Sequence, residues 1–235
     1  MNTRTAGSPP KSAEELDQQR LDKLRTRYRS LPRAERYHAN RYGDLEGRVN
    51  LYMMRKALLR AFRSAPADAR ILDIPCGTAQ YSWFYASLGY RVTASDVSPQ
   101  MIEVASKPRE TVAKGFQPKF EVADIFNLHF APHSFDIAVT IRLFHLLNRA
   151  ERIVALGQMA RVSELVVADY SHKLSLKHLS RVVRYRLGLR KEPRLRFSKA
   201  DLIKEVGEAG LELRDLIWVA PGLSEIWLAV LKKKG

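Results

Sequence analysis

The chain has 235 residues, a net charge of +15 and a single cysteine, Cys76. This length suits one folded domain with an extension. One cysteine excludes an intrachain disulfide and a cysteine-based metal site. No apolar run approaches the roughly 20 residues that span a bilayer, and residues 1–11 lack the apolar centre of a signal peptide. We therefore expect a cytoplasmic protein without a metal site.

The positive charge is concentrated in the two flanks of the chain. Residues 1–70 carry 16 basic and 8 acidic residues, residues 71–170 carry 9 and 10, and residues 171–235 carry 15 and 7. Basic flanks around a nearly neutral centre indicate an anionic partner, such as nucleic acid, a membrane surface or a phosphorylated substrate. A solvated surface rich in lysine and arginine would give the same pattern.

Residues 1–44 are interpreted as a basic, partly disordered helical arm. Ser12 and Glu15 form a capping-box pattern ahead of a polar helix with few apolar residues. A stronger helix follows in the domain that we assign to residues 45–235, and its broad apolar stripe is expected to pack on a sheet. The stripe includes Leu45, Val49, Tyr52, Met53, Leu58 and Phe62.

The segment 70–79, Arg-Ile-Leu-Asp-Ile-Pro-Cys-Gly-Thr-Ala, carries the first functional signal. Its apolar run without helical period predicts a strand, Pro75 and Gly77 break the run, and residues 80–88 follow as a helix. Strand, tight turn and helix form the first unit of a doubly wound α/β fold, which binds ligands beyond the carboxyl ends of its strands. Asp73 would repel a pyrophosphate at this turn. It suits a cationic ligand with an ammonium or sulfonium group.

Residues 72–79 resemble motif I of the class I S-adenosylmethionine (SAM) methyltransferases, which typically reads Leu-Asp-x-Gly-Cys-Gly-Thr-Gly. Pro75 and Ala79 replace two glycines, and Ala79 suits the turn only if its backbone is not left-handed. The resemblance implies a Rossmann-like, seven-stranded, mostly parallel sheet with SAM as cofactor. It also implies that Asp73 acts on the ammonium group of SAM. The turn residues Pro75, Cys76, Gly77 and Thr78 would let the backbone approach the cofactor.

The next two strands are expected to end in further acidic residues. Asp96 follows Asp73 by 23 positions, a spacing at which a carboxylate can accept hydrogen bonds from a ribose diol, although NAD would fit the same spacing. Ser98 is expected to cap the following helix, and the Asp-x-Ser-x-x-Met pattern resembles the family and adds Val97 and Met101 to the site. By the same resemblance, Asp124 would bind the adenine amine and Ile125 would pack on the ring. Asp124 could instead be a plain helix or turn cap.

Residues 135–141 form an unbroken apolar run typical of a central parallel strand. The resemblance places Ile141 and Arg142 along the methionyl part of SAM, where Arg142 could pair with the carboxylate; a surface arginine at a helix start is an equal alternative. The following residues resemble a family segment that ends in a histidine pair, of which only His145 is present. A general base is needed only if the acceptor must lose a proton. The candidates are His145, which the family favours, Asp169, Tyr170 and His172, although His145 could simply pack behind the strand.

The last third of the chain is expected to complete the sheet. A helix over 149–161 precedes a strand over 164–170. The Ser198-x-x-Asp201 pattern caps a helix that stops at Gly210, and a final strand pair over 211–219 and 226–231 makes the last strand antiparallel. The resemblance covers about 45–171 and 198–232.

Between these parts lies a basic insert, residues 172–197, after the fifth strand. Leucines and Val183 recur there at helical spacing among lysines and arginines, which predicts a basic amphipathic helix. This helix could cover the mouth of the active site, contact an anionic membrane or lipid, or contact RNA.

These observations predict a SAM-dependent methyltransferase that acts on a small or lipid-linked, anionic acceptor at O, N or C, as a cytoplasmic enzyme that could be peripheral at the inner membrane. The general likeness is to small bacterial methyltransferases with a Methyltransf-11-type core, including quinone C-methyltransferases. One alternative is an RNA methyltransferase that uses the basic flanks, although the chain lacks an Asn/Asp-Pro-Pro-Tyr motif after the fourth strand. Another is a SAM-binding protein with little catalysis, which Pro75 and Ala79 would suit. A dehydrogenase is disfavoured because the turn lacks the second and third glycines of the dinucleotide fingerprint.

Overall fold

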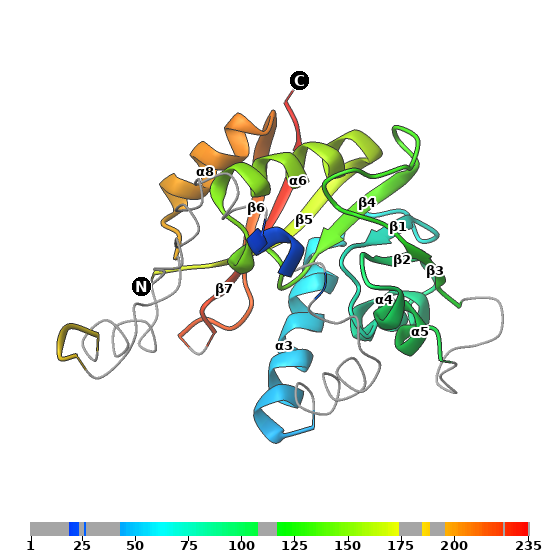
Figure 1. Cartoon of the computed structure of the whole chain (residues 1–235), viewed down its shortest axis with the longest axis horizontal. Helices are drawn as coiled ribbons and strands as arrows, with labels where there is room; N and C mark the ends of the chain where they lie inside the picture. The colour runs from blue at the N-terminus through cyan, green and yellow to red at the C-terminus, as the bar shows by residue number, and fades with distance from the viewer. Residues whose placement is uncertain are drawn as a thin grey trace, which may run out of the picture.

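The computed structural model describes residues 19–23, 26, 43–107, 117–173, 185–188, 196–222 and 224–234. Its strands are β1 Arg70–Asp73, β2 Arg91–Asp96, β3 Lys119–Val122, β4 Phe135–Thr140, β5 Ser163–Ser171, β6 Leu211–Trp218 and β7 Ile226–Lys233. They form one seven-stranded sheet in the order β3-β2-β1-β4-β5-β7-β6 (Figure 1). The first five strands are parallel, and β7 runs antiparallel to both β5 and β6. The predicted doubly wound, mostly parallel sheet is thereby confirmed.

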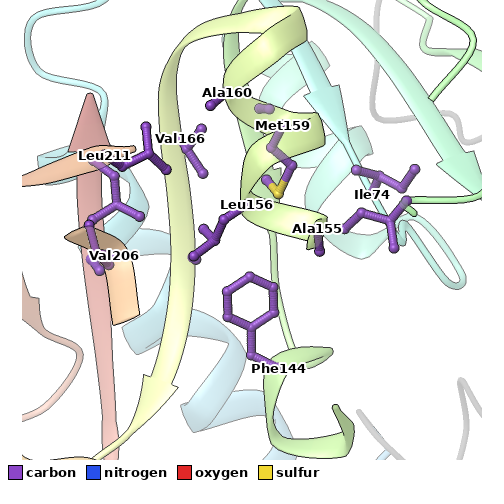
Figure 2. Close-up of a cluster of buried hydrophobic side chains, with 14 of the residues drawn as sticks. Ile74, Phe144, Ala155, Leu156, Met159, Ala160, Val166, Val206 and Leu211 are labelled. Carbon is purple, nitrogen blue, oxygen red and sulfur yellow. The ribbon is translucent and has the colours of Figure 1, made fainter. Parts of the chain in front are cut away.

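Helices cover both faces of the sheet. They are α3 Leu45–Ala61, α4 Gln80–Ser87, α5 Pro99–Ala105, the 3-10 helix η1 Phe144–Leu146, α6 Arg149–Val162 and α8 Lys199–Glu208. Helices α6 and α8 contribute to a core cluster on one face, and α3, α4 and α5 to a second cluster on the other (Figure 1). In the first cluster, Leu156 and Met159 of α6 meet Val166 of β5 and Phe144 of η1 (Figure 2). This two-layer burial holds the parallel strands in register.

Helix α3 buries only its carboxyl-terminal half. Asp44 caps its start, because the Asp44 carboxylate accepts a hydrogen bond from the backbone N–H of Gly47 at 2.7 Å. The buried residues of this helix are Met54, Ala57, Leu58 and Ala61.

The prediction that the whole stripe packs on the sheet is confirmed for Leu58 and Phe62, which are buried, and is wrong for Leu45, Val49 and Tyr52. These side chains are 76%, 46% and 55% exposed. The helix carries apolar side chains on two opposite faces, and the sheet can cover only one of them.

Most of the predicted arm and of the predicted basic insert lies outside the described residues. Residues 19–23 and 26 are helical, and they belong to the predicted arm helix. Of the insert, the structure describes residues 172, 173, 185–188, 196 and 197. Within the described parts of the chain, no helix is both long enough and apolar enough to cross a membrane.

Candidate functional site

The turn that follows β1 is held from both sides by neighbouring strands. The backbone N–H of Ile74 donates to the carbonyl of Val139 at 2.9 Å, and that of Cys76 donates to the carbonyl of Ser95 at 2.8 Å. The peptide bond between Ile74 and Pro75 is cis. The two hydrogen bonds fix the turn at the carboxyl ends of β1, β2 and β4, where doubly wound folds bind their ligands.

Ala79 has a left-handed backbone, the conformation in which an alanine was expected not to suit this turn. Its φ is 57° and its ψ is 31°, and Gly77 in the same turn has a φ of 54°. The backbone N–H of Ala79 donates to the carbonyl of Cys76, and the carbonyl of Ala79 accepts from Trp83 in the first turn of α4. These contacts impose on the alanine a conformation that suits glycine, at a cost of about 1–2 kcal/mol.

Asp73 lies at the end of β1 and is 2% exposed. Its carboxylate accepts a hydrogen bond from the Ser82 hydroxyl of α4. Burial raises the pKa of Asp73 to about 7; the Ser82 hydrogen bond opposes this shift, and the neighbouring Asp96 carboxylate adds to it. The site therefore carries a carboxyl group that is costly to ionise in the absence of a cation.

Asp96 ties the turn to the start of α5. One oxygen of its carboxylate accepts from the backbone N–H of Gly77 at 3.0 Å, and the other accepts from that of Ser98 at 3.0 Å. Ser98 caps α5 through a bond from the Met101 backbone N–H, as predicted. Burial raises the pKa of Asp96 to about 6 even though these backbone donors favour the ionised form. Each oxygen keeps a lone pair that could accept from a ribose hydroxyl.

This donor set fits a cationic nucleoside. Two buried carboxylates, Asp73 and Asp96, lie on neighbouring strands. The pKa of the buried Cys76 thiol is raised mainly by its burial and further by these two carboxylates. The described groups that shift the pKa of Asp73 are Ser82 and Asp96, of which neither is a cation. A positive ligand group would offset the cost of ionising both carboxylates, whereas a pyrophosphate would raise that cost. Thr78 is also buried beside the turn.

The end of β3 meets the end of β2, as the predicted site requires. The backbone N–H of Ala123 donates to the carbonyl of Asp96 at 3.2 Å. Asp124 follows immediately, half-buried, and its carboxylate accepts from the backbone N–H of Phe126 at 3.0 Å. Asp124 thus caps its own turn, which is the alternative role expected from the sequence. Ile125 and Met101 are buried in the interior, and Val97 is half-buried.

Beyond β4, the chain turns sharply, and a hydrogen bond to the Asp169 side chain holds this turn. Arg142 has a φ of 67°, and its backbone N–H donates to the Asp169 carboxylate of β5 at 2.7 Å. Ile141 is buried just before this turn. Asp169 therefore shapes the backbone at the carboxyl ends of β4 and β5, next to η1 with its half-buried His145.

Tyr170 and His172 occupy the interior rather than the open edge of the sheet. The Tyr170 hydroxyl donates to Glu205 at 3.1 Å, and burial raises its pKa well above the usual value. His172 is fully buried against the rings of Trp218 and Trp227, with centroid distances of 4.7 and 4.8 Å, and these two rings also contact each other. These contacts leave His145 and Asp169 as the base candidates near the turn after β4.

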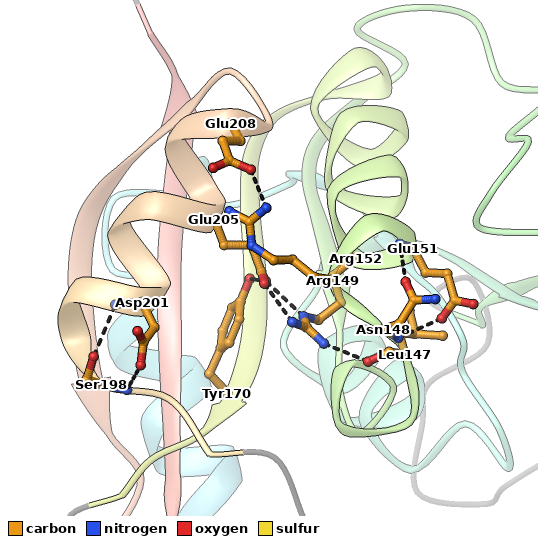
Figure 3. Close-up of polar contacts among 10 residues, drawn as sticks. All are labelled: Leu147, Asn148, Arg149, Glu151, Arg152, Tyr170, Ser198, Asp201, Glu205 and Glu208. Carbon is orange, nitrogen blue, oxygen red and sulfur yellow. Dashed lines mark hydrogen bonds and ion pairs between the residues drawn. The ribbon is translucent and has the colours of Figure 1, made fainter. Parts of the chain in front are cut away.

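A polar network that the sequence did not indicate supports the segment with His145. Arg152 of α6 donates to the Leu147 carbonyl at 2.6 Å and pairs with Glu205 of α8 (Figure 3). The Asn148 side chain and Glu151 form a capping box at the start of α6. Arg20, from the amino-terminal segment, donates to the Leu146 carbonyl at 3.0 Å and pairs with Glu151. In the sequence, the only sign of this network is that Arg152 and Glu205 stand among apolar residues of their helices.

The known proteins to which this chain is similar in sequence are methyltransferases. A family model described as a methyltransferase domain matches residues 71–164. Demethylmenaquinone methyltransferase of Renibacterium salmoninarum is 38% identical over 122 residues, which cover 50% of this chain and 48% of that protein. O-methyltransferase cnsE of Penicillium expansum is 35% identical over 114 residues, 46% of this chain and 40% of that protein. The chain spans about half the length of the curated relatives it matches.

A solved structure extends the likeness to nearly the whole fold. Magnesium protoporphyrin IX methyltransferase (ChlM) from Synechocystis PCC 6803, with bound SAH, aligns with a TM-score of 0.73 at 18% identity. The alignment covers 91% of this chain and 100% of that chain. At this level of identity the comparison demonstrates a shared fold. Among the described residues, no group of three or more His, Cys, Asp or Glu side chains could hold a metal ion.

Proposed function

We propose that this chain, which shares its fold with a solved methyltransferase structure, transfers a methyl group from SAM to a small-molecule acceptor. The observation that carries the proposal is the buried Asp73 carboxyl group beside Asp96 at the ends of β1 and β2. Such a pair favours a cationic nucleoside. SAM supplies the reactive methyl group, which its sulfonium makes electrophilic.

The chain's own residues supply binding and alignment. Asp73 pairs with the ammonium group, directly or through water, and Asp96 accepts from the ribose hydroxyls. Asp124 and Ile125 receive the adenine, and the turn 75–78 brings its backbone close to the cofactor. Ile141 and Arg142 lie along the methionyl part, where Arg142 can pair with the carboxylate. Alignment of this kind can contribute up to about 7–11 kcal/mol to the rate.

For the acceptor, we propose a small hydroxylated or quinone-type molecule, lipid-linked or anionic. The names of two similar proteins, a demethylmenaquinone methyltransferase and an O-methyltransferase, support this class. The basic flanks of the chain support an anionic group on the acceptor. If the acceptor must lose a proton, His145 is the candidate base, because η1 places it beside the turn that Asp169 shapes.

Calorimetric titration tests the proposal directly. SAM is expected to bind the full chain and NAD is not. Asp96→Ala is expected to weaken SAM binding at least about tenfold, because it removes two buried acceptors that hold the turn as well as the ribose contact. Asp68→Ala, at an exposed position paired with Arg91, is the control and should bind SAM as the native chain does. Binding of NAD with no heat from SAM would overturn the proposal.

A further inference from the structure

Helix α3 carries an apolar stripe that no described part of the chain covers. Among the described residues, Leu45, Val49, Tyr52 and Leu59 belong to the most exposed large apolar side chains, at 45–76% exposure. At 100° per residue they fall within about 80° of the helix circumference. The buried residues Met54 and Ala61 lie on the opposite side of the same helix. Packing on the sheet therefore does not explain the stripe.

Basic side chains flank this stripe on both sides. Arg48 and Arg60 are exposed at about 60° to either side of its centre. Lys56 lies within the stripe, with its ammonium group 5.0 Å from the centroid of the Tyr52 ring. The helix contains four basic residues and one acidic residue, Glu46. An apolar stripe bordered by arginine and lysine is the pattern of a helix that lies in a membrane interface.

Helix α3 contacts the chain next to the turn that follows β1. The Arg55 guanidinium donates to the Gln80 carbonyl at 3.5 Å, and Gln80 begins α4 directly after that turn. The helix continues about 15 Å from Arg55 to Leu45, and its amino-terminal half extends beyond the sheet (Figure 1). The amino-terminal half of α3 therefore extends away from the neighbourhood of the turn after β1.

Charge decides between the possible occupants. Two copies joined through this face would bring Arg48, Lys56 and Arg60 against their equivalents, in a protein of net charge +15, and like charges oppose such a contact. We propose that the exposed face of α3, defined by Leu45, Val49, Tyr52, Lys56 and Leu59, docks on an anionic lipid bilayer. Arginine and lysine then meet the headgroups while the apolar side chains enter the interface. This docking does not depend on the proposed methyl transfer.

Co-sedimentation of the full chain with lipid vesicles tests the inference. The native chain is expected to bind vesicles that contain phosphatidylglycerol, to bind pure phosphatidylcholine vesicles much more weakly, and to lose affinity as salt is raised. The double variant Val49→Glu/Tyr52→Glu should bind at least about tenfold more weakly. The control Val154→Glu/Ile203→Glu makes the same charge change at exposed apolar positions of α6 and α8 and should bind as the native chain does.

Three further measurements complete the test. Circular dichroism and SAM calorimetry of both double variants establish that they are folded, and their SAM binding is expected to match that of the native chain. Equal vesicle binding by the α3 variant and its control would overturn the inference. The same holds if the native chain binds vesicles with and without phosphatidylglycerol equally well. Sedimentation velocity showing a dimer that only the α3 variant dissociates would assign the face to a second copy and would also overturn it.

Discussion

Arg152 and Glu205 form a bidentate ion pair in the interior, and each side chain is 2% exposed. The Arg152 guanidinium donates two hydrogen bonds to the Glu205 carboxylate, at 2.9 and 2.7 Å. It also lies 4.8 Å from the centroid of the Phe197 ring. The pair joins α6 to α8 across the sheet face that contains Tyr170 (Figure 3). The segment with His145 therefore depends on a contact between distant parts of the chain.

Removing one partner of this pair is expected to be strongly destabilising. Glu205→Gln leaves the Arg152 charge buried without its counter-ion, at a cost of about 3–5 kcal/mol in the free energy of unfolding. Urea unfolding at neutral pH measures the effect. The control is Glu208→Gln, which removes an exposed partner of Arg149 and should change the stability little. Similar stabilities of the two variants would contradict this account of the pair.

Ala79→Gly is expected to stabilise the fold. The substitution relieves the left-handed strain at Ala79, about 1–2 kcal/mol, and loses up to about 1 kcal/mol because glycine makes the unfolded chain more flexible. The net gain expected in urea unfolding is about 0–2 kcal/mol. Ala86→Gly is the matched control, since Ala86 lies inside α4 and glycine destabilises a helix interior. If Ala79→Gly were as destabilising as Ala86→Gly, the strain assigned to this turn would be absent.

The buried carboxyl groups predict a pH dependence of stability with a definite sign. The pKa of Asp73 is raised to about 7 and that of Asp96 to about 6, from an ordinary value of 3.8. Between pH 4 and 7 the folded chain therefore binds more protons than the unfolded chain at these positions, and their contribution to stability falls as the pH rises. For Asp73 alone, a shift of about three units corresponds to about 4 kcal/mol.

Asp73→Asn isolates that contribution. Asparagine keeps an acceptor for the Ser82 hydroxyl and has no proton to lose. The variant is expected to gain stability relative to the native chain at pH 8, by up to about 4 kcal/mol, and much less at pH 4. Urea unfolding at the two pH values gives the difference. A constant offset between the two proteins across this range would show that Asp73 keeps its ordinary pKa.

Local signals in the sequence were sufficient for the order of the elements. Ser98, Ser198 and Asp201 cap their helices as predicted, because capping depends on residues within one turn. The apolar run 135–141 corresponds to the central strand β4, and the break after Asp73 corresponds to the tight turn. These features are encoded within about ten residues, so that one sequence is enough to predict them.

Features that depend on tertiary contacts were not predictable in the same way. The left-handed Ala79 follows from bonds that hold the turn between β2 and β4. The partners Arg152 and Glu205 are 53 positions apart, and no local pattern pairs them. The two apolar faces of α3 look equivalent in sequence, and only the assembled sheet determines which one is covered. In the candidate site, the interior positions of Tyr170 and His172 likewise follow from packing of β5 against α8 and β7.

The most direct test of the account is the proton balance of SAM binding. If the positive group of SAM meets the Asp73 carboxylate, binding must ionise Asp73, and near pH 7 the complex should release part of a proton. Calorimetry in buffers of different ionisation enthalpy measures this release. The account predicts proton release from the native chain and little or none from the folded Asp73→Asn variant. SAM binding by the native chain without proton release at pH 7 would contradict the central claim.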